Sequence, residues 1–128
     1  MRINYGQSVH GNEEINAVVK VLKNSTQLGR NVQIFEKKVS SLYSKKYGLM
    51  VNSGSSALLL AFDSLNFPKG SEVITPVLTF STSISYIIKN DLKPVFIDVK
   101  RNSFCIDEDQ IKNALTKKTV AIVIPNLL

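Results

Sequence analysis

Four small polar residues and a glycine, Asn52-Ser53-Gly54-Ser55-Ser56, form the stretch of this sequence best suited to hold a ligand. They follow a short apolar run and lead directly into an apolar, helix-forming run. The first N–H groups of a helix have no partner within the helix, and the helix dipole is positive there, so such a start binds anions. Gly54 permits a tight turn and the close approach of a ligand, and Ser55 and Ser56 add hydroxyl donors. The chemistry of residues 52–56, called the corner below, favours a phosphate group.

The corner matches neither of the common nucleotide-binding loops. The glycine and lysine positions of GxxxxGK[ST] and GxGxxG are missing, which disfavours a nucleotide triphosphate. Ser53 or Ser55 could instead serve only as the cap of a helix, since Ser-Gly-Ser corners are common at helix starts. The residues by themselves leave phosphate binding and simple capping both open.

Phe80 is a second candidate site residue, within the stretch TPVLTFSTSISY of residues 75–86. Pro76 begins a loop after a strand-like run, and a helical pattern starts at Phe80. An aromatic side chain at the carboxyl end of a strand, beside a phosphate corner, could stack on a flat ring, which is worth ~1 kcal/mol beyond burial. The alternative is a place in the core, where most phenylalanines lie.

The remaining polar residues carry weaker signals. His10 is the only histidine. It has no cysteine or acidic cluster at ligand spacing, so we predict no metal site and no Ser-His-Asp triad. Cys105 lies between two apolar residues and is expected to be a small packing residue. Asp98 ends a strand-like run and is either a turn residue or a ligand contact.

The elements that must position these residues begin with two helical patterns. Ile15, Val18, Val19 and Leu22 fall on one helix face, and a second pattern spans residues 32–43 and ends near Gly48. Strand-like runs (49–51, 72–75, 94–99 and 119–124) then alternate with helical runs (56–65, 80–89 and 107–115). The sequence therefore predicts an α/β fold with a mainly parallel sheet and flanking helices, whose strand ends carry the corner and Phe80.

Composition and charge narrow the classes of function. The 128 residues are 44% hydrophobic and carry a net charge of +6. The basic residues are dispersed in doublets without interleaved stacking aromatics, which predicts solvated surfaces rather than a nucleic-acid patch. No apolar run approaches the ~20 residues of a membrane span, and the N-terminal stretch has no signal-peptide core, so we expect no membrane association. The single cysteine excludes an internal disulfide and fits a cytoplasmic location.

The motifs NSGSSAL, GSEVI, PVFIDV and VAIVI, in this order and spacing, resemble the opening of the DegT/DnrJ/StrS-type sugar aminotransferases. These are pyridoxal-phosphate (PLP) enzymes of fold type I, and the resemblance runs from about Gly29 to Leu128. It implies the N-terminal part of the large domain of such an enzyme. Residues 1–128 are then a single partial domain, with N-terminal helices in 1–47 and the corner and the start of the sheet in 48–128. The rest of the catalytic and small domains would be absent.

The resemblance also implies roles for the candidate residues. The family's SGT or SGS corner binds the cofactor phosphate, and it falls here on Gly54, Ser55 and Ser56. The aromatic residue that covers the pyridine ring falls on Phe80. The aspartate that partners the pyridine nitrogen and the lysine that binds the cofactor covalently come from segments beyond the match, so no catalytic residue is expected in this chain. We expect the isolated 128-residue chain to be inactive.

For the parent protein, the resemblance implies an aminotransferase acting on a nucleotide-linked keto-deoxysugar. Glutamate would be the amino donor, and the product would feed surface polysaccharide, lipopolysaccharide or an amino-sugar natural product. Family members work as homodimers. The alternatives are the sugar 3-dehydratase branch, in which a histidine replaces the covalent lysine, and a catalytically inert, binding-only fragment. A further rival is an unrelated flavodoxin-like or nucleotide-binding module, in which Ser55 and Phe80 would lie far apart.

Overall fold

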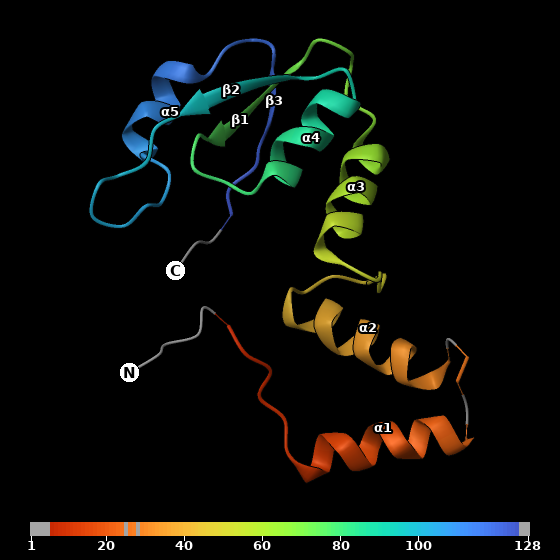
Figure 1. Cartoon of the computed structure of the whole chain (residues 1–128). Helices are drawn as coiled ribbons and strands as arrows, with labels where there is room; N and C mark the ends of the chain where they lie inside the picture. Colours follow the sequence, from red (N-terminus) through yellow and green to blue (C-terminus); the bar gives the residue numbers. More distant parts are fainter. Residues whose placement is uncertain (1–5, 25, 28, 126–128) are drawn as a thin grey trace. The chain divides into compact units, whose positions relative to one another are not determined.

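The computed structural model describes residues 6–24, 26–27 and 29–125. The chain forms two compact units, Met1–Met50 and Val51–Leu128. Figure 1 labels the helices and strands of both units, and each unit is treated separately below.

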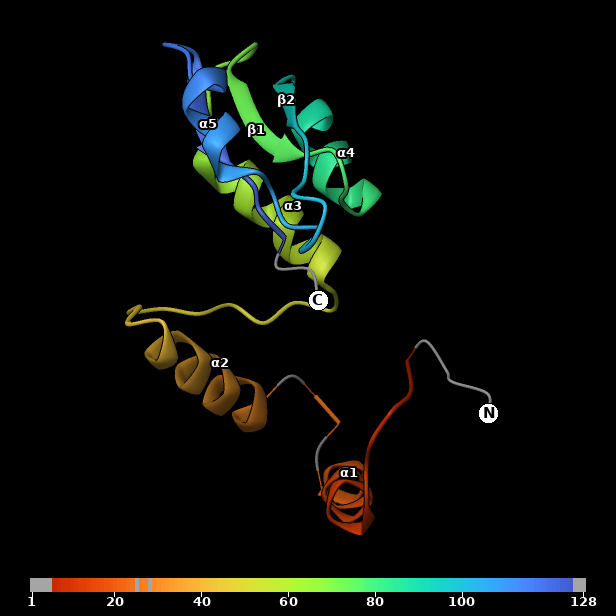
Figure 2. The same cartoon turned by 90° about the vertical axis from the view of Figure 1, so that its left-hand side faces the viewer.

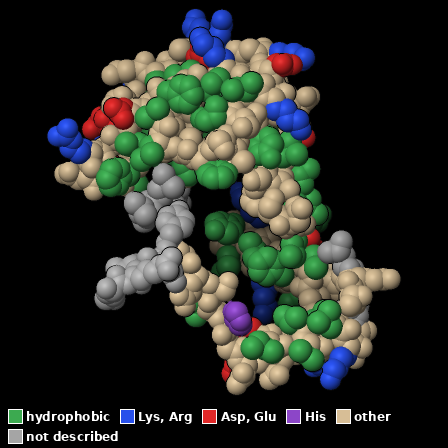
Figure 3. Space-filling view, viewed as in Figure 1, with side chains coloured by type: hydrophobic (Ala, Val, Ile, Leu, Met, Phe, Trp, Pro, Cys, Tyr) green, Lys and Arg blue, Asp and Glu red, His purple; other side chains and the backbone are tan. Residues whose placement is uncertain are grey.

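The first unit contains α1 (Asn12–Asn24) and α2 (Arg30–Leu42), which confirms both helices predicted from hydrophobic spacing. At the start of α1, the Gly11 N–H donates to the Glu14 carboxylate at 2.7 Å. This bond lowers the pKa of Glu14, as does its own backbone N–H. The predicted apolar face of α1 is exposed: Leu22, at its end, is 64% accessible, and no described residue of the helix is buried. Figure 3 shows apolar side chains at the surface of both units.

Helix α2 ends at Leu42, earlier than the expected end near Gly48, and the chain then turns back along it. Ser44 adopts a left-handed φ of 53° in this turn. A Cβ on Gly48 would lie 2.8 Å from the carbonyl oxygen of Glu36, so only glycine allows the approach. The Met50 N–H then donates to the Glu36 carboxylate at 2.8 Å.

The second unit is built on three parallel strands, β1 (Glu72–Pro76), β2 (Lys93–Ile97) and β3 (Thr119–Ile122), in the order β2-β1-β3. The predicted parallel sheet is confirmed. Strand β1 lies in the centre, and four of its five residues are buried. Successive side chains of a strand point to opposite faces, so β1 needs cover on both.

Three helices supply that cover. Val73 packs with Phe62, Ile87 and Leu92, which come from α3 (Gly54–Leu65), α4 (Ser81–Lys89) and the segment after α4. Ile74 packs on the other face with Ile97 and Ile106, against α5 (Glu108–Ala114). Figure 2 shows α4 and α5 on opposite sides of the strands.

One strand prediction was wrong and another was wrong in part. Residues 49–51 form no strand, because a strand needs a hydrogen-bonding neighbour and none of the described strands pairs with them. The run 94–99 leaves the sheet at Ile97, and Val99 forms an isolated antiparallel bridge with Ile106 instead. This bridge closes the loop between β2 and α5. No described helix is both long and apolar enough to span a bilayer.

Candidate functional site

The corner forms the start of α3, and Ser53 is its N-cap. Ser53 has an extended backbone, with φ −160° and ψ 159°, and its Oγ accepts the Ser56 N–H at 3.1 Å. The Ser53 hydroxyl in turn donates to Ser56 Oγ at 3.0 Å. Ser53 is therefore a capping residue, as the helix-capping interpretation of the corner predicted. Its donor is used within the corner, which leaves the hydroxyl proton of Ser56 available to a ligand.

Capping does not use up the donors of the corner. Within the described part of the chain, the N–H groups of Gly54 and Ser55 have no hydrogen-bond acceptor, as expected for the first two positions of a helix. The first turn of α3 contains no acidic side chain, so its own residues do not neutralise the positive end of the helix dipole. The corner therefore has hydrogen-bond donors without acceptors, and it lies at the positive end of the helix dipole.

Gly54 adds space rather than a special backbone conformation. Its φ is outside the left-handed region, which Gly70 alone occupies among the described glycines. The expectation that Gly54 serves a tight turn therefore finds no support in its dihedral angles. A Cβ built on Gly54 would meet nothing within 4 Å. The protein's own packing does not require glycine here, so the missing Cβ leaves room for a ligand to reach the N–H groups.

Phe80 does not lie in the core. It is the N-cap residue of α4, with φ −72° and ψ 142°, and it is 70% exposed. Thr79 and Ser83 hold the backbone around it: Thr79 Oγ1 donates to Ser83 Oγ at 3.0 Å, and the Ser83 N–H donates to the Phe80 carbonyl at 3.0 Å. Within the described chain, Phe80 is therefore not a core residue, and its role as a ligand contact stays a prediction.

The corner and Phe80 lie at the same edge of the second unit. Helix α3 ends at Leu65, before the loop that leads into the start of β1, so its N-terminus lies toward the other end of that strand. Helix α4 begins just after β1 ends, and the two helices pack on each other. Figure 2 shows both N-termini on the side to which the strand arrows point. Parallel α/β sheets bind ligands at this carboxyl edge.

The other three candidate residues, Asp98, Cys105 and His10, do not form a ligand site in the described chain. Asp98 is a turn residue: its Oδ1 accepts the Val99 N–H at 2.7 Å, and its carbonyl accepts the Asp107 N–H at 2.9 Å. Cys105 is exposed, so its prediction as a packing residue was wrong. His10 is exposed as well, and no group of potential metal ligands gathers among the described residues.

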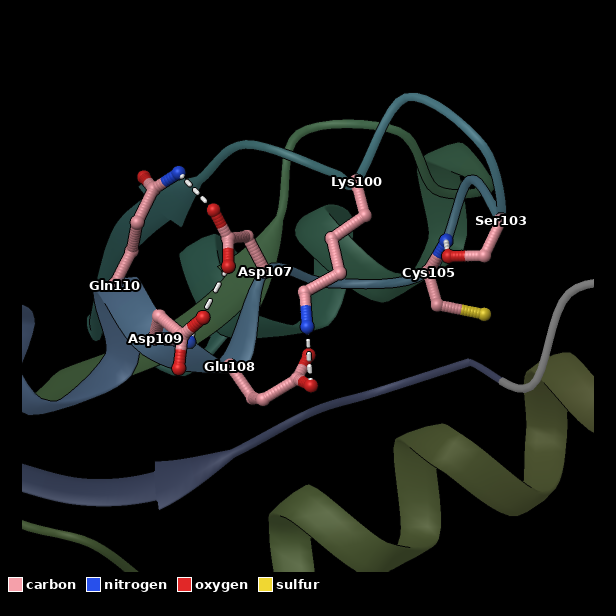
Figure 4. A network of polar contacts seen from close by, with 7 residues as sticks. All are labelled: Lys100, Ser103, Cys105, Asp107, Glu108, Asp109 and Gln110. Carbon is pink, nitrogen blue, oxygen red and sulfur yellow. Dashed lines mark hydrogen bonds and ion pairs between the residues drawn. The ribbon is translucent and has the colours of Figure 1, made fainter.

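Sequence reasoning missed a polar network in the loop between β2 and α5 (Figure 4). Lys100 Nζ contacts the Glu108 carboxylate, and this hydrogen bond raises the pKa of Lys100 and lowers that of Glu108. Asp107 caps α5 by accepting the Asp109 N–H at 3.2 Å and the Gln110 side-chain amide at 2.7 Å. The acidic triplet 107–109 marks the helix start in the sequence, but the partner Lys100 is visible only in the fold.

The fold, with its corner at the start of α3, is the N-terminal part of the large domain of a fold type I PLP enzyme. The solved E. coli GDP-4-keto-6-deoxy-D-mannose-3-dehydratase with bound hydrated PLP matches it with a TM-score of 0.87 and 31% identity, over 97% of this chain and 34% of that one. The model of the DegT/DnrJ/EryC1/StrS aminotransferase family matches residues 8–128. The chain belongs to this family.

Known relatives include both branches of the family. The chain is 36% identical over 123 residues to a GDP-4-keto-6-deoxy-D-mannose 3-dehydratase of Yersinia pseudotuberculosis, covering 91% of this chain and 31% of that protein. It is 37% identical over 120 residues to the spore coat polysaccharide biosynthesis protein SpsC of Bacillus subtilis, covering 93% and 31%. A 3-oxo-glucose-6-phosphate:glutamate aminotransferase of B. subtilis is 28% identical over 117 residues, covering 88% and 26%. The chain thus spans about a third or less of the length of these relatives.

Proposed function

We propose that this chain supplies the phosphate-binding corner and the ring-covering residue of a PLP-dependent enzyme that acts on a nucleotide-linked keto-deoxysugar. The observation that carries the proposal is the start of α3, where the N–H groups of Gly54 and Ser55 lack acceptors and open space replaces a Cβ. In this proposal, residues 1–47 contribute N-terminal helices and residues 48–128 the start of the cofactor domain.

The phosphate would be held by three kinds of donor in the corner. The N–H groups of Gly54 and Ser55 and the hydroxyl of Ser56 can each donate to a phosphate oxygen. Charge-assisted hydrogen bonds of this kind contribute about 1.5–3 kcal/mol each. The absence of acid from the first turn of α3 lets the helix dipole add to this attraction.

Phe80 would cover one face of the cofactor ring. Its side chain is 70% exposed beside the start of α4, and stacking on a flat heterocycle would bury that apolar surface. A ring contact of this kind is worth about 0.5–1.5 kcal/mol beyond burial. It would also exclude water from one side of the ring and fix its plane.

The cofactor, when bound, supplies the electron sink for moving nitrogen on or off a carbon atom. The residues of this chain bind and orient it, and we propose that none of them is catalytic. The covalent lysine and the aspartate that partners the pyridine nitrogen would come from other segments of the parent protein. We therefore propose that the isolated chain binds without turnover.

For the parent protein we propose aminotransfer from glutamate to the sugar, in a cytoplasmic homodimer that feeds surface polysaccharide, lipopolysaccharide or amino-sugar synthesis. Removal of the sugar's 3-hydroxyl is the second candidate, because a 3-dehydratase is among the relatives, at 36% identity. Product analysis of the complete gene product separates the two, because aminotransfer retains the donor nitrogen in the sugar and dehydration does not.

The experiment on this chain is a calorimetric titration with inorganic phosphate and with pyridoxamine 5′-phosphate, which needs no covalent lysine. Gly54→Ala fills the space above the donors and should weaken both ligands at least about tenfold, since it costs at least one charge-assisted bond. Alanine also favours a helix over glycine, so the melting temperature should not fall. Gly6→Ala is the matched control, because its Cβ also meets nothing within 4 Å. Equal binding by wild type and Gly54→Ala would contradict the proposal.

A further inference from the structure

The loop that carries Phe80 is held at both of its ends. After β1, the Val77 N–H donates to the Ile97 carbonyl of β2 at 2.8 Å. At the start of α4, Thr79 Oγ1 donates to Ser83 Oγ at 3.0 Å. Residue 80 therefore stands on a fixed backbone although its ring is exposed.

The start of α4 departs from the usual capping pattern. An N-cap side chain normally accepts the N–H of the second or third helical residue, and Ser, Thr, Asp or Asn provides the oxygen. Here Phe80 is the N-cap residue and makes no side-chain cap. The Ser83 N–H turns to the Phe80 carbonyl at 3.0 Å, and the hydroxyl of the preceding residue, Thr79, reaches Ser83 Oγ. The Thr79–Ser83 bond therefore does not cap a helix N–H, but it ties the residue before Phe80 to the third residue of α4.

At this site the polar residues are buried or half-buried and the aromatic residue is exposed, the reverse of the usual arrangement. Ser83 is 7% accessible and Thr79 is half-buried, whereas the aromatic ring between them in the chain is 70% accessible. Burying a hydroxyl is unfavourable unless it is hydrogen-bonded. The bond between Thr79 and Ser83 meets this condition, so the two hydroxyls can be buried next to an exposed residue.

We propose that Thr79 and Ser83 are positioning residues that hold the Phe80 ring in the plane required to cover an aromatic, phosphate-bearing ligand. The inference rests on the proposed function, because that function supplies the ring that Phe80 covers. By joining the residue before Phe80 to the first turn of α4, the two hydroxyls fix the backbone that carries the ring. Such a fixed backbone lowers the ordering cost of stacking.

The test compares two ligands that share the corner but differ in the ring. Calorimetry measures the affinity of the chain for pyridoxamine 5′-phosphate and for inorganic phosphate, in wild type, Thr79→Val and Ser83→Ala. Loss of the hydroxyl bond should weaken pyridoxamine phosphate about threefold to tenfold, the usual effect of one neutral hydrogen bond. Phosphate affinity should stay unchanged, because the corner is on another helix. A general loss of structure would weaken both ligands, so that result would overturn the inference.

Three further variants sharpen the test. Thr79→Ser keeps the donor and should retain wild-type affinity. Thr75→Val is the matched control: Thr75 is fully buried, and its hydroxyl has no hydrogen-bond partner among the described residues, so its loss should leave both affinities unchanged. In a Phe80→Ala background, Thr79→Val should cause no additional loss, because the effect passes through the ring. An additional loss of the same size would overturn the inference.

The two proposals fail in different ways. If Phe80→Ala weakens pyridoxamine phosphate in the wild-type chain but Thr79→Val and Ser83→Ala do not, only the positioning role falls. If the wild-type chain binds neither ligand, the proposed function and this inference fall together. Melting curves of every variant check that each one folds.

Discussion

The second unit contains two helix starts that follow opposite designs. Helix α3 begins with Gly-Ser-Ser, has no acid in its first turn and leaves two N–H groups without acceptors in the described structure. Helix α5 begins after Asp107 and carries Glu108 and Asp109 in its first turn. Its carboxylates take up its own donors and the Lys100 ammonium. A helix start whose own carboxylates accept its N–H groups has no donors left for a ligand, whereas a start without such carboxylates can bind an anion.

The largest effect should come from making α3 resemble α5. Ser55→Asp places a carboxylate at the second helical position, where it competes with phosphate for the same donors and repels it. We expect the affinity for inorganic phosphate to fall about a hundredfold or more, the cost of two charge-assisted bonds. Titration calorimetry measures this loss. Asn31→Asp is the matched control, since it adds the same charge at the second position of α2. Retained phosphate binding in Ser55→Asp would mean that the corner is not the anion site.

A smaller effect separates capping from binding. Ser53→Ala and Asp107→Ala each remove an N-cap acceptor, at α3 and α5. Each should lower the free energy of unfolding by about 0.5–2 kcal/mol, measured by urea denaturation. Only Ser53→Ala should also weaken phosphate binding, because Ser53 holds Ser56. A comparable loss of phosphate binding in Asp107→Ala would break the distinction between the two helix starts.

The smallest effect is the pH dependence of the bond between Lys100 and Glu108. The folded pKa of Glu108 is lowered from its ordinary value of 4.5, by the Lys100 hydrogen bond first and then by its own backbone N–H. A lowered folded pKa stabilises above the unfolded pKa, and this stability is lost as the pH falls through the folded pKa. We expect wild type to melt slightly above Glu108→Gln at neutral pH, and this gap should close in acid below pH 4.5. A gap that persists in acid would show that the bond does not depend on the carboxylate charge.

Local pattern was enough where the structure depends on nearest neighbours. The spacing of apolar residues predicted α1 and α2, because one helix face repeats every three to four residues. The corner was recognisable because a helix start leaves donors free whatever surrounds it. Likewise the acids at 107–109 marked the start of α5.

Pattern failed where a residue depends on a distant partner. Residues 49–51 have strand composition, yet no described strand pairs with them. The apolar residues of α1 lie on one helix face as predicted, but that face is not buried in the described chain. Cys105 sits between apolar neighbours and is nevertheless exposed. In each case burial or strand pairing depends on which distant residues come into contact, and local composition does not determine that.

The sequence by itself determined the helices, the alternation with strands and the donor chemistry of Gly54, Ser55 and Ser56, because these follow from local backbone geometry. Only the tertiary structure decided that Phe80 is exposed rather than buried, that Asp98 is a turn residue and that open space lies above Gly54. Exposure and open space depend on which elements pack together, and that packing brings the starts of α3 and α4 to one edge of the sheet.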